Sequence, residues 1–255
     1  MDTSAKGLRV LVTAGAAGIG RVIAQTFLDH GARVHVCDVD DKALAGLPKQ
    51  ITHTRADVAD VVQVDKLFED VKKALGGLDV LVNNAGIAGP TAKVEDIDPK
   101  DWDRTIAIDV NGMFYCTRKG MPLIKAAGGG SIINLSSIAG RLAFPMRTAY
   151  SFAKFGVVGF TESLAAEAGP DNVRVNCIQP GVVEGERIGR VIAAKAKQLG
   201  ASEMEIKNRM LEGVSMHTTV SPQDIANVAL FLATEPGKHI SGQAISVCGG
   251  ARYLV

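Results

Sequence analysis

Short apolar runs alternate with stretches of helical periodicity along most of the chain. The runs are rich in β-branched residues and predict strands at 8–13, 33–37, 51–55, 79–83, 132–135, 173–178 and 243–247. Apolar residues between several of these runs recur on one helix face, which predicts helices at 21–30, 61–75, 98 or 100–127, and 149–160. This alternation predicts an α/β fold in which a doubly wound, parallel sheet of about seven strands is flanked by helices.

A glycine-rich turn, A-G-A-A-G-I-G at 14–20, joins the first strand to the first helix. Glycines there let the backbone approach a pyrophosphate, and the helix N-terminus offers free N–H groups, which is typical of a Rossmann-type dinucleotide fold. Asp38 ends the second strand, where a carboxylate accepts hydrogen bonds from ribose hydroxyls and repels a 2′-phosphate. We therefore expect NAD rather than NADP, although a glycine-rich turn can also bind nothing.

Tyr150 and Lys154 stand one turn apart on a predicted helix, so their side chains are neighbours. The pKa of a free tyrosine is about 10, so a tyrosine acts as a base near neutrality only if a cation stabilises its phenolate. Lys154 can supply that cation, and Ser137, after the strand at 132–135, can hydrogen-bond the substrate oxygen. These three residues are the expected catalytic set. The competing interpretation is a helix with a core tyrosine and a surface lysine.

Composition narrows the class of protein. The 255 residues suffice for one domain, 1–255, and the 47% apolar and 22% charged residues argue against disorder. A net charge of +1 gives no indication of a nucleic-acid or membrane-surface partner, and four scattered cysteines match no metal motif, so we expect no metal site. Without a signal peptide or an apolar run of about 18 residues, a cytoplasmic location is expected.

Several motifs in register resemble the classical short-chain dehydrogenase/reductase family over nearly the whole chain. They are the T-A-G-A-A-G-I-G loop at 13–20, Asp38, Asp57-Val58, N-N-A-G at 83–86, Ser137, Y-S-F-A-K at 150–154 and Pro180-Gly181. The resemblance implies that Ser137, Tyr150 and Lys154 are catalytic and that the protein is a homotetramer. It also implies the following cofactor-binding residues: Gly15, Gly18, Ile19, Gly20, Asp38, Asp57, Val58, Asn84, Tyr150, Lys154 and Val183. Asp57 and Val58 would meet the adenine, Asn84 would line the cleft, and Val183 would touch the nicotinamide amide.

Two positions depart from the family pattern. Ala14 replaces the first glycine of the loop. A methyl group is tolerated there if the φ of this residue is negative, so we expect an adjusted loop with a negative φ and retained dinucleotide binding. Asp109 stands where the family usually has an asparagine that anchors a proton-relay water. Its carboxylate can hold a water or pair with Lys154, or it can oppose the negative charge of the phenolate, so it is left out of the expected catalytic set.

The substrate is expected at the carboxyl ends of the strands. An insertion at about 182–217 is predicted to form a lid, and Gly185 replaces a threonine frequent in the family. Arg147 is close enough to Tyr150 to clamp a carboxylate or sugar hydroxyl, or it forms a surface or subunit salt bridge. A small polar or acidic alcohol, such as a sugar derivative or hydroxy acid, is the expected substrate.

The leading functional hypothesis is thus an NAD-dependent oxidoreductase that exchanges a hydride with a small polar secondary alcohol or ketone. One alternative is an NADPH-linked reductase of 3-oxoacyl thioesters, against which Asp38 argues. The other is a dinucleotide-sensing protein that has kept the fold and lost turnover, which the presence of Ser137, Tyr150 and Lys154 opposes.

Overall fold

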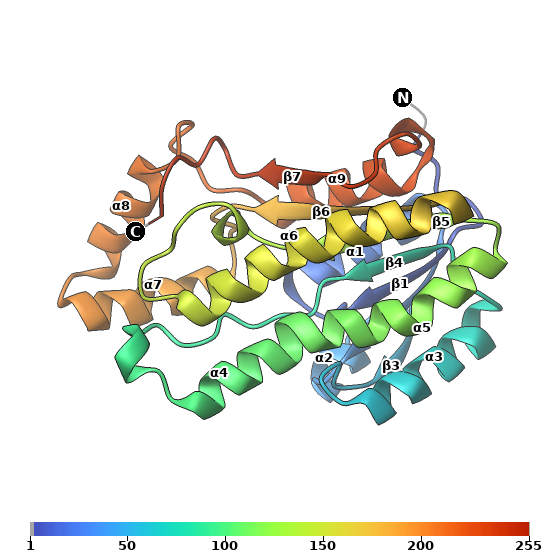
Figure 1. Ribbon diagram of the computed structural model, residues 1–255, viewed down its shortest axis with the longest axis horizontal. Helices are drawn as coiled ribbons and strands as arrows, with labels where there is room; N and C mark the ends of the chain where they lie inside the picture. Colours follow the sequence, from blue (N-terminus) through green and yellow to red (C-terminus); the bar gives the residue numbers. More distant parts are fainter. Residues whose placement is uncertain (1–2, 255) are drawn as a thin grey trace.

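The computed structural model describes residues 3–254, and these form one parallel sheet of seven strands (Figure 1). The strand order is β3-β2-β1-β4-β5-β6-β7. The strands are β1 (Arg9–Thr13), β2 (Arg33–Asp38), β3 (Thr52–Arg55), β4 (Val80–Asn83), β5 (Gly130–Leu135), β6 (Val173–Pro180) and β7 (Ala244–Val247). The predicted seven-stranded, doubly wound fold is confirmed.

The order of the strands reverses between β1 and β4. From β1 the chain builds outward to β3, and it then crosses back so that β4 pairs with the other side of β1. Val10 accordingly lies between Val34 of β2 and Val80 of β4. Such a switch point opens a crevice at the carboxyl ends of the strands, and ligands of this class of fold bind there.

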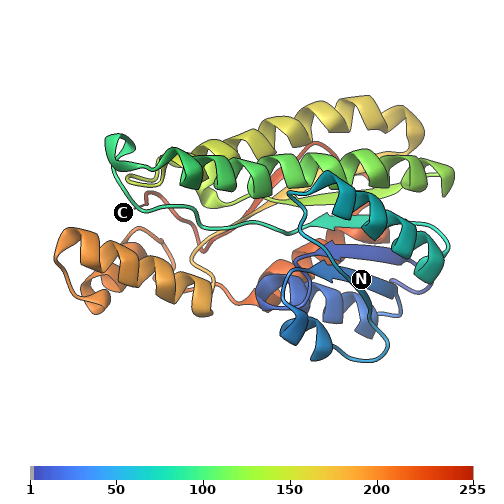
Figure 2. The same ribbon diagram turned by 90° about the horizontal axis from the view of Figure 1, so that it is seen from below.

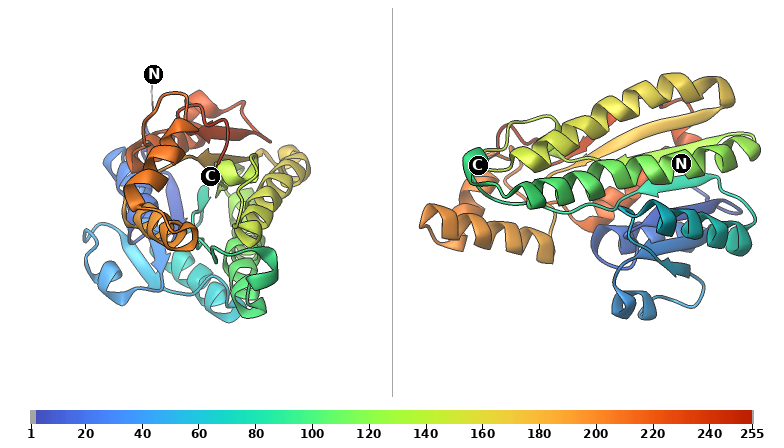
Figure 3. Two further views of the ribbon diagram at one scale, coloured as in Figure 1. Left: turned by 90° about the vertical axis from the view of Figure 1, so that its left-hand side faces the viewer. Right: turned by 60° about the horizontal axis from the view of Figure 1, so that its bottom comes forward.

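Helices cover both faces of the sheet, as Figure 3 shows. One face packs against α1 and α9, and the other against α3, α5 and α6. The helices in chain order are α1 (Gly18–Asp29), α2 (Asp41–Ala45), α3 (Val61–Leu75), α4 (Pro99–Ile106), α5 (Met113–Ala126), α6 (Thr148–Ala168), α7 (Glu186–Leu199), α8 (Glu203–Glu212) and α9 (Pro222–Ala233). In β1, Val10 and Val12 point to the α1 side and Leu11 to the α3 side, so the three central residues of this strand are apolar on both faces.

The long helix predicted from about residue 98 to 127 is present, with one irregularity. A π-helical segment, Ala107–Gly112, joins α4 to α5. Gly112 permits close packing here, because a Cβ at this position would lie 2.6 Å from a Val58 methyl group. The segment carries Asp109, and π-helical insertions of this kind are frequent at functional sites.

The 182–217 segment lies beyond the carboxyl ends of the strands, where Figure 2 shows α7 and α8 in orange at the left. It has its own apolar cluster, in which Ile192, Ile206 and Met210 are buried together with Ala251 of the C-terminal segment. The segment is therefore a packed unit over the crevice. The later helix α9 begins with a capping box between Ser221 and Asp224 and was missing from the sequence-based prediction.

Three further observations limit the chemistry of the chain. Within residues 3–254, no helix combines the length and the apolar character that a membrane crossing requires. The same residues contain no cluster of three or more histidine, cysteine, aspartate or glutamate side chains suited to a metal ion. All four cysteines are free and buried.

Candidate active site

A cavity of about 640 Å³ lies at the carboxyl ends of the strands, between the switch point and the 182–217 segment. Its walls include the glycine-rich loop, the loop after β5, the start of α6 and the start of α7. The residues expected for catalysis or cofactor binding that line it are Gly18, Ile19, Gly20, Asp38, Asn84, Ser137, Tyr150, Lys154 and Val183. Residues separated by up to 165 positions in sequence thus share one enclosed space.

The N-terminus of α1 opens into this cavity without a side-chain cap. Ala17 occupies the cap position, and the first turn carries no acidic residue. The first N–H groups of the helix therefore remain available to an anion. Gly20 is required for packing, because a Cβ there would lie 2.2 Å from the Ala14 carbonyl oxygen and 2.4 Å from Asn84 Nδ2.

Asn84 ties the ends of β1 and β4 together beneath the cavity. Its Nδ2 donates to the carbonyl oxygens of Thr13 and Ala14, at 2.9 and 3.0 Å. Its backbone N–H donates to the Thr13 hydroxyl at 3.0 Å. This side chain therefore fixes the floor of the crevice at the switch point.

Asp38 lies at the end of β2, on the cavity wall. Its carboxylate accepts hydrogen bonds from the backbone N–H groups of Ala16, Val39 and Asp40, at 3.2, 2.8 and 3.2 Å. These bonds hold the carboxylate beside the glycine-rich loop. Among residues 3–254, Asp38 forms no ion pair, so its negative charge is not neutralised.

The prediction for Ala14 is wrong. Its φ is +47°, in the left-handed region, whereas the sequence-based expectation was a negative value. The loop must turn sharply after β1, because the Gly15 N–H donates to the Cys37 carbonyl oxygen at 3.0 Å and the Ala14 carbonyl oxygen accepts from Asn84 Nδ2. The hydrogen bonds impose the turn, and the alanine adopts the strained conformation that a glycine would take freely.

Tyr150 and Lys154 face the other end of the cavity from the first turns of α6. The Lys154 ammonium lies 5.5 Å from the centroid of the Tyr150 ring and donates to the Leu135 carbonyl oxygen at 3.1 Å. Ser137 follows β5, and its hydroxyl oxygen accepts from the Ala139 N–H at 3.1 Å. The Ser137 hydroxyl hydrogen is thus left to donate to another group.

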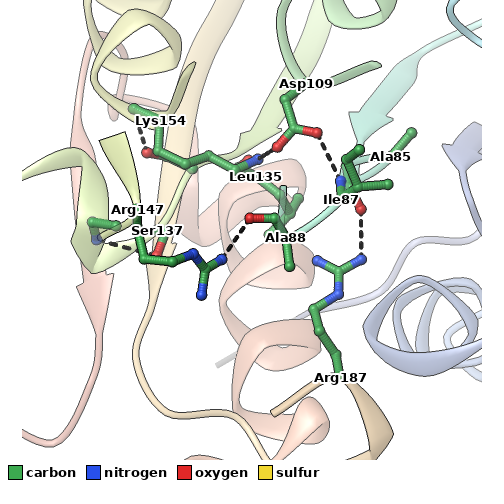
Figure 4. A network of polar contacts seen from close by, with 12 residues as sticks. Ala85, Ile87, Ala88, Asp109, Leu135, Ser137, Arg147, Lys154 and Arg187 are labelled. Atoms are coloured by element: carbon green, nitrogen blue, oxygen red, sulfur yellow. Dashed lines mark hydrogen bonds and ion pairs between the residues drawn. The ribbon is translucent and has the colours of Figure 1, made fainter. Parts of the chain in front are cut away.

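Asp109 contacts this group directly. Its Oδ2 lies 3.2 Å from Lys154 Nζ, and its Oδ1 accepts from the Ile87 N–H at 2.7 Å (Figure 4). The carboxylate is completely buried and the lysine almost so. The pairing with Lys154 that the sequence left open is therefore present.

Three expected cofactor residues do not line the cavity. Gly15 packs against β2, where a Cβ would lie 2.7 Å from the Val36 side chain. Asp57 pairs with Arg104 at 2.9 Å, and Val58 is buried. The contacts of Asp57 and Val58 with an adenine, and that of Gly15 with the cofactor, remain predictions. In the structure, Gly15 and Val58 are packed against neighbouring residues and Asp57 forms an ion pair.

Val183 and Gly185 mark the entrance to the 182–217 segment. Val183 lines the cavity and forms a parallel bridge with Val220. Gly185 has a φ of +130° and its Cβ position is open, so no side chain reaches the cavity from here. Both residues lie where the chain leaves β6 for α7.

Arg147 is buried in the wall of the cavity rather than at the surface. Its Nη2 donates to the Ala88 carbonyl oxygen at 2.5 Å, and its guanidinium carbon lies 5.1 Å from the ring centroids of both Phe144 and Tyr150. Burial lowers the pKa of this guanidinium. The predicted reach of Arg147 into the pocket is present. Arg147 forms no ion pair with another of residues 3–254, and the alternative of a subunit salt bridge is not tested.

Two further cations from α7 approach the same end of the cavity. Arg187 donates to the Gly86 carbonyl oxygen at 2.6 Å, so that Arg147 and Arg187 point toward the same stretch of chain (Figure 4). Lys195 is buried, with Nζ 4.5 Å from the Phe144 ring centroid. Sequence reasoning missed Lys195, because a lysine within a charged helix gives no signal that it points inward.

Comparison with known proteins places these features in a family. Residues 14–252 match the family model described as Enoyl-(Acyl carrier protein) reductase. An uncharacterised short-chain type dehydrogenase/reductase of Sinorhizobium fredii is 33% identical and aligns over 96% of this chain and 97% of its own. A 3-oxoacyl-[acyl-carrier-protein] reductase of Chlamydia muridarum is 34% identical over 94% and 95% of the two chains. A D-beta-hydroxybutyrate dehydrogenase of Rhizobium meliloti is 33% identical over 94% and 96%.

Solved structures agree with this relationship. An NAD⁺-bound xylitol dehydrogenase superposes with a TM-score of 0.92 at 26% identity, covering 96% of this chain and 99% of its own. A 3-ketoacyl-(acyl-carrier-protein) reductase from Brucella melitensis, complexed with NADH, has a TM-score of 0.86 at 28% identity over 97% and 99%. The chain therefore belongs to the short-chain dehydrogenase/reductase family of oxidoreductases, which bind dinucleotides.

Proposed function

We propose that this protein is an NAD-dependent oxidoreductase that interconverts a small polar secondary alcohol and its ketone. One observation carries the proposal: the uncapped start of α1, Asp38, and the group Ser137, Tyr150 and Lys154 all line one cavity. The helix N-terminus would hold the pyrophosphate of a dinucleotide and Asp38 its ribose, and Tyr150 lines the same cavity.

The residues present fit NAD better than NADP. The free N–H groups at the start of α1 suit a pyrophosphate, and the unneutralised carboxylate of Asp38 accepts ribose hydroxyls. A 2′-phosphate would meet this negative charge, to which the neighbouring Asp40 adds. NAD, when bound, supplies the nicotinamide carbon that accepts a hydride from the alcohol carbon.

The side chains at the opposite end of the cavity bind the substrate oxygen and transfer its proton. In the oxidation direction, Ser137 donates a hydrogen bond to the substrate oxygen and so holds it in place. The phenolate of Tyr150 takes the hydroxyl proton as the carbon loses its hydride, and a ketone is formed. The ammonium of Lys154, 5.5 Å from the Tyr150 ring, stabilises the phenolate.

The relatives support hydride transfer without choosing the substrate. They include a hydroxybutyrate dehydrogenase and 3-oxoacyl reductases, and the xylitol dehydrogenase and one 3-ketoacyl reductase among the solved structures are bound to NAD⁺ and NADH. The specific observation that favours a small substrate is the packed 182–217 segment over the cavity, with Arg147 buried in the wall. Segment 182–217 acts as a lid in this proposal.

The test is NADH formation, followed by absorbance, with NAD or NADP and a panel of hydroxy acids, sugar acids, polyols and simple secondary alcohols. Turnover with NAD is expected on one class. The variant Tyr150→Phe should lose turnover and still bind NADH, whereas Tyr115→Phe, on α5, should keep both. Turnover by Tyr150→Phe would contradict the mechanism. Tight NADH binding without turnover of any class of substrate would favour the dinucleotide-sensing alternative. A preference for NADP, with turnover of 3-oxoacyl thioesters, would favour the alternative of an NADPH-linked reductase.

We also infer a homotetramer. The exposed faces of α5 and α6 carry large apolar side chains, with Phe114, Phe152 and Phe155 each about half exposed. Trp102 extends this surface, since its ring centroid lies 5.5 Å from that of Phe152. Contiguous exposed apolar surface of this kind supports subunit contacts. Light scattering of the purified protein measures the oligomeric state.

A further inference from the structure

The substrate end of the cavity gathers positive charge that no protein carboxylate balances. Arg147, from the start of α6, and Arg187, from α7, line the cavity there. Lys195 of α7 is buried against the ring of Phe144, which also lines the cavity, and it feels the charge of Arg147. Among residues 3–254, none of the three forms an ion pair. Asp109 is already paired with Lys154 at 3.2 Å. Of the two glutamates in the cavity wall, Glu186 pairs with Arg190 at 3.4 Å and Glu184 accepts from the Thr219 hydroxyl at 2.6 Å.

Arg147 is bonded in a way that leaves capacity for a ligand. Among the described residues, the guanidinium has one hydrogen-bond acceptor, the neutral carbonyl oxygen of Ala88, and its buried Nε–H has none. A guanidinium offers five N–H donors in a planar fork that matches a carboxylate. A buried cation with unused donors is costly unless an anion completes it.

Lys195 is likewise a buried cation with unused N–H donors. Its Nζ is buried and has no hydrogen-bond acceptor among residues 3–254. Burial, and secondarily the charge of Arg147, lower the pKa of Lys195 to about 8. Both cations pack against the Phe144 ring, with Nζ at 4.5 Å and the guanidinium carbon at 5.1 Å from its centroid. The two charges thus lie close together and each disfavours the other.

We propose that the substrate carries an anionic group, a carboxylate above all, which binds at Arg147 and Lys195 beside Phe144. This inference rests on the proposed function and specifies its substrate class. The guanidinium carbon of Arg147 lies only 5.1 Å from the Tyr150 ring centroid, so the anionic group must be a few bonds from the alcohol carbon. A short hydroxy acid meets this condition. Because Lys195 belongs to the 182–217 segment, the same anion holds that segment over the cavity.

Matched pairs of alcohols test the proposal in the presence of NAD at pH 7. The pairs share a carbon skeleton and differ in charge: lactate with propane-1,2-diol, 3-hydroxybutyrate with butane-1,3-diol, glycerate with glycerol, and gluconate with glucitol. Glycerol 3-phosphate is a further arm, which distinguishes a phosphate from a carboxylate. A charged hydrogen bond contributes about 1.5–3 kcal/mol, so the anionic member of a productive pair should have a kcat/KM higher by about 10- to 100-fold.

Variants assign the preference to the two residues. Arg147→Met should lower kcat/KM for the anionic member about 100-fold and remove the preference over the neutral member, and Arg147→Lys should restore part of it. Lys195→Met should lower kcat/KM for the anionic member about 10-fold. Lys197→Met, an exposed lysine on the same helix, is the matched control and should change nothing.

Equal kcat/KM values for charged and neutral members, or a loss in Arg147→Met that is equal for both, would overturn the anion site. If no pair is oxidised, the proposed function fails, and binding alone then decides on the anion site. Calorimetric titration of the enzyme–NADH complex with glycerate and with glycerol provides that measurement. Binding of glycerate only, lost in Arg147→Met and kept in Lys197→Met, supports the site. Absence of glycerate binding, or equal binding of both compounds, refutes it.

Discussion

Nζ of Lys154 lies 3.2 Å from Oδ2 of Asp109, and both side chains are buried beside the cavity. The carboxylate is held from its other side by the Ile87 N–H at 2.7 Å, so its position is fixed. A negative charge therefore stands at the position where the family usually has a neutral asparagine. It offsets much of the positive potential that Lys154 would otherwise exert on Tyr150.

This relationship predicts the behaviour of Asp109→Asn. The amide oxygen still accepts from Ile87, but the negative charge is gone, so the phenolate of Tyr150 is stabilised more strongly by Lys154. The acidic limb of the profile of kcat/KM against pH should therefore move to lower pH, by about one unit. Asp103→Asn, exposed on α4, is the control and should leave the profile in place. A profile for Asp109→Asn that coincides with the wild type would show that the carboxylate does not act on the proton transfer.

Asp38 is predicted to determine the choice between NAD and NADP. In Asp38→Asn the amide oxygen can still accept from the backbone of the turn, whereas the charge that repels a 2′-phosphate is removed. The ratio of kcat/KM for NAD to that for NADP should fall about tenfold or more, since one charge contact is typically 1.5–3 kcal/mol. Asp29→Asn, exposed at the C-terminal end of α1, should not alter the ratio. An unchanged ratio in Asp38→Asn would place cofactor selection elsewhere.

Much of the framework was predictable because it depends on local patterns. The centre of strand β1, residues 10–12, is buried on both faces and is therefore a continuous apolar run. The spacing of Tyr150 and Lys154 on α6 places their side chains together. Parallel strands bring their carboxyl ends to one edge, which explains why Ser137 and the glycine-rich loop meet in one cavity.

Other features depend on contacts that the sequence does not display. Arg147 and Lys195 are buried only because Phe144 and the 182–217 segment close over them. The π-helical turn at Ala107–Gly112 requires Val58 to pack where Gly112 has no side chain. Helix α9, by contrast, had a visible signal in Ser221 and Asp224, since this capping box opens an apolar run.

The strained conformation of Ala14 predicts a stabilising substitution. At a φ of +47° an alanine is less favourable than a glycine, and the Cβ is the cause. Ala14→Gly should raise the free energy of unfolding by about 1 kcal/mol, measured by urea denaturation. The matched change Ala16→Gly, in the same loop without a positive φ, should lower it, because a buried methyl group is lost and the unfolded chain gains freedom. Destabilisation by Ala14→Gly would show that the Cβ of Ala14 does not strain the loop.

His35 is a buried, neutral histidine in the middle of β2. Its ring nitrogens contact the hydroxyl groups of Thr52 and Thr54, at 2.8 and 3.0 Å. Burial is the main cause that lowers the pKa of His35 to about 4; the charge of Asp70 opposes it, and that of His53 adds to it. His35 therefore stays unprotonated in the folded protein at pH values at which the same residue in the unfolded chain, with a pKa of about 6.5, binds a proton.

The sign of the pH effect follows from this difference. Between about pH 6.5 and pH 4 the unfolded state binds more protons at this position, so stability is lost as the pH falls through that window, by up to about 3 kcal/mol. In His35→Gln this contribution to the slope should vanish, even though the variant is less stable at pH 7 because of imperfect packing. Replacing His239, an exposed histidine near the C-terminal end of the chain, by glutamine should leave the slope as in the wild type. Urea denaturation at several values of pH between 4 and 7 gives the slopes, and an unchanged slope in His35→Gln would mean that other groups govern the acid sensitivity.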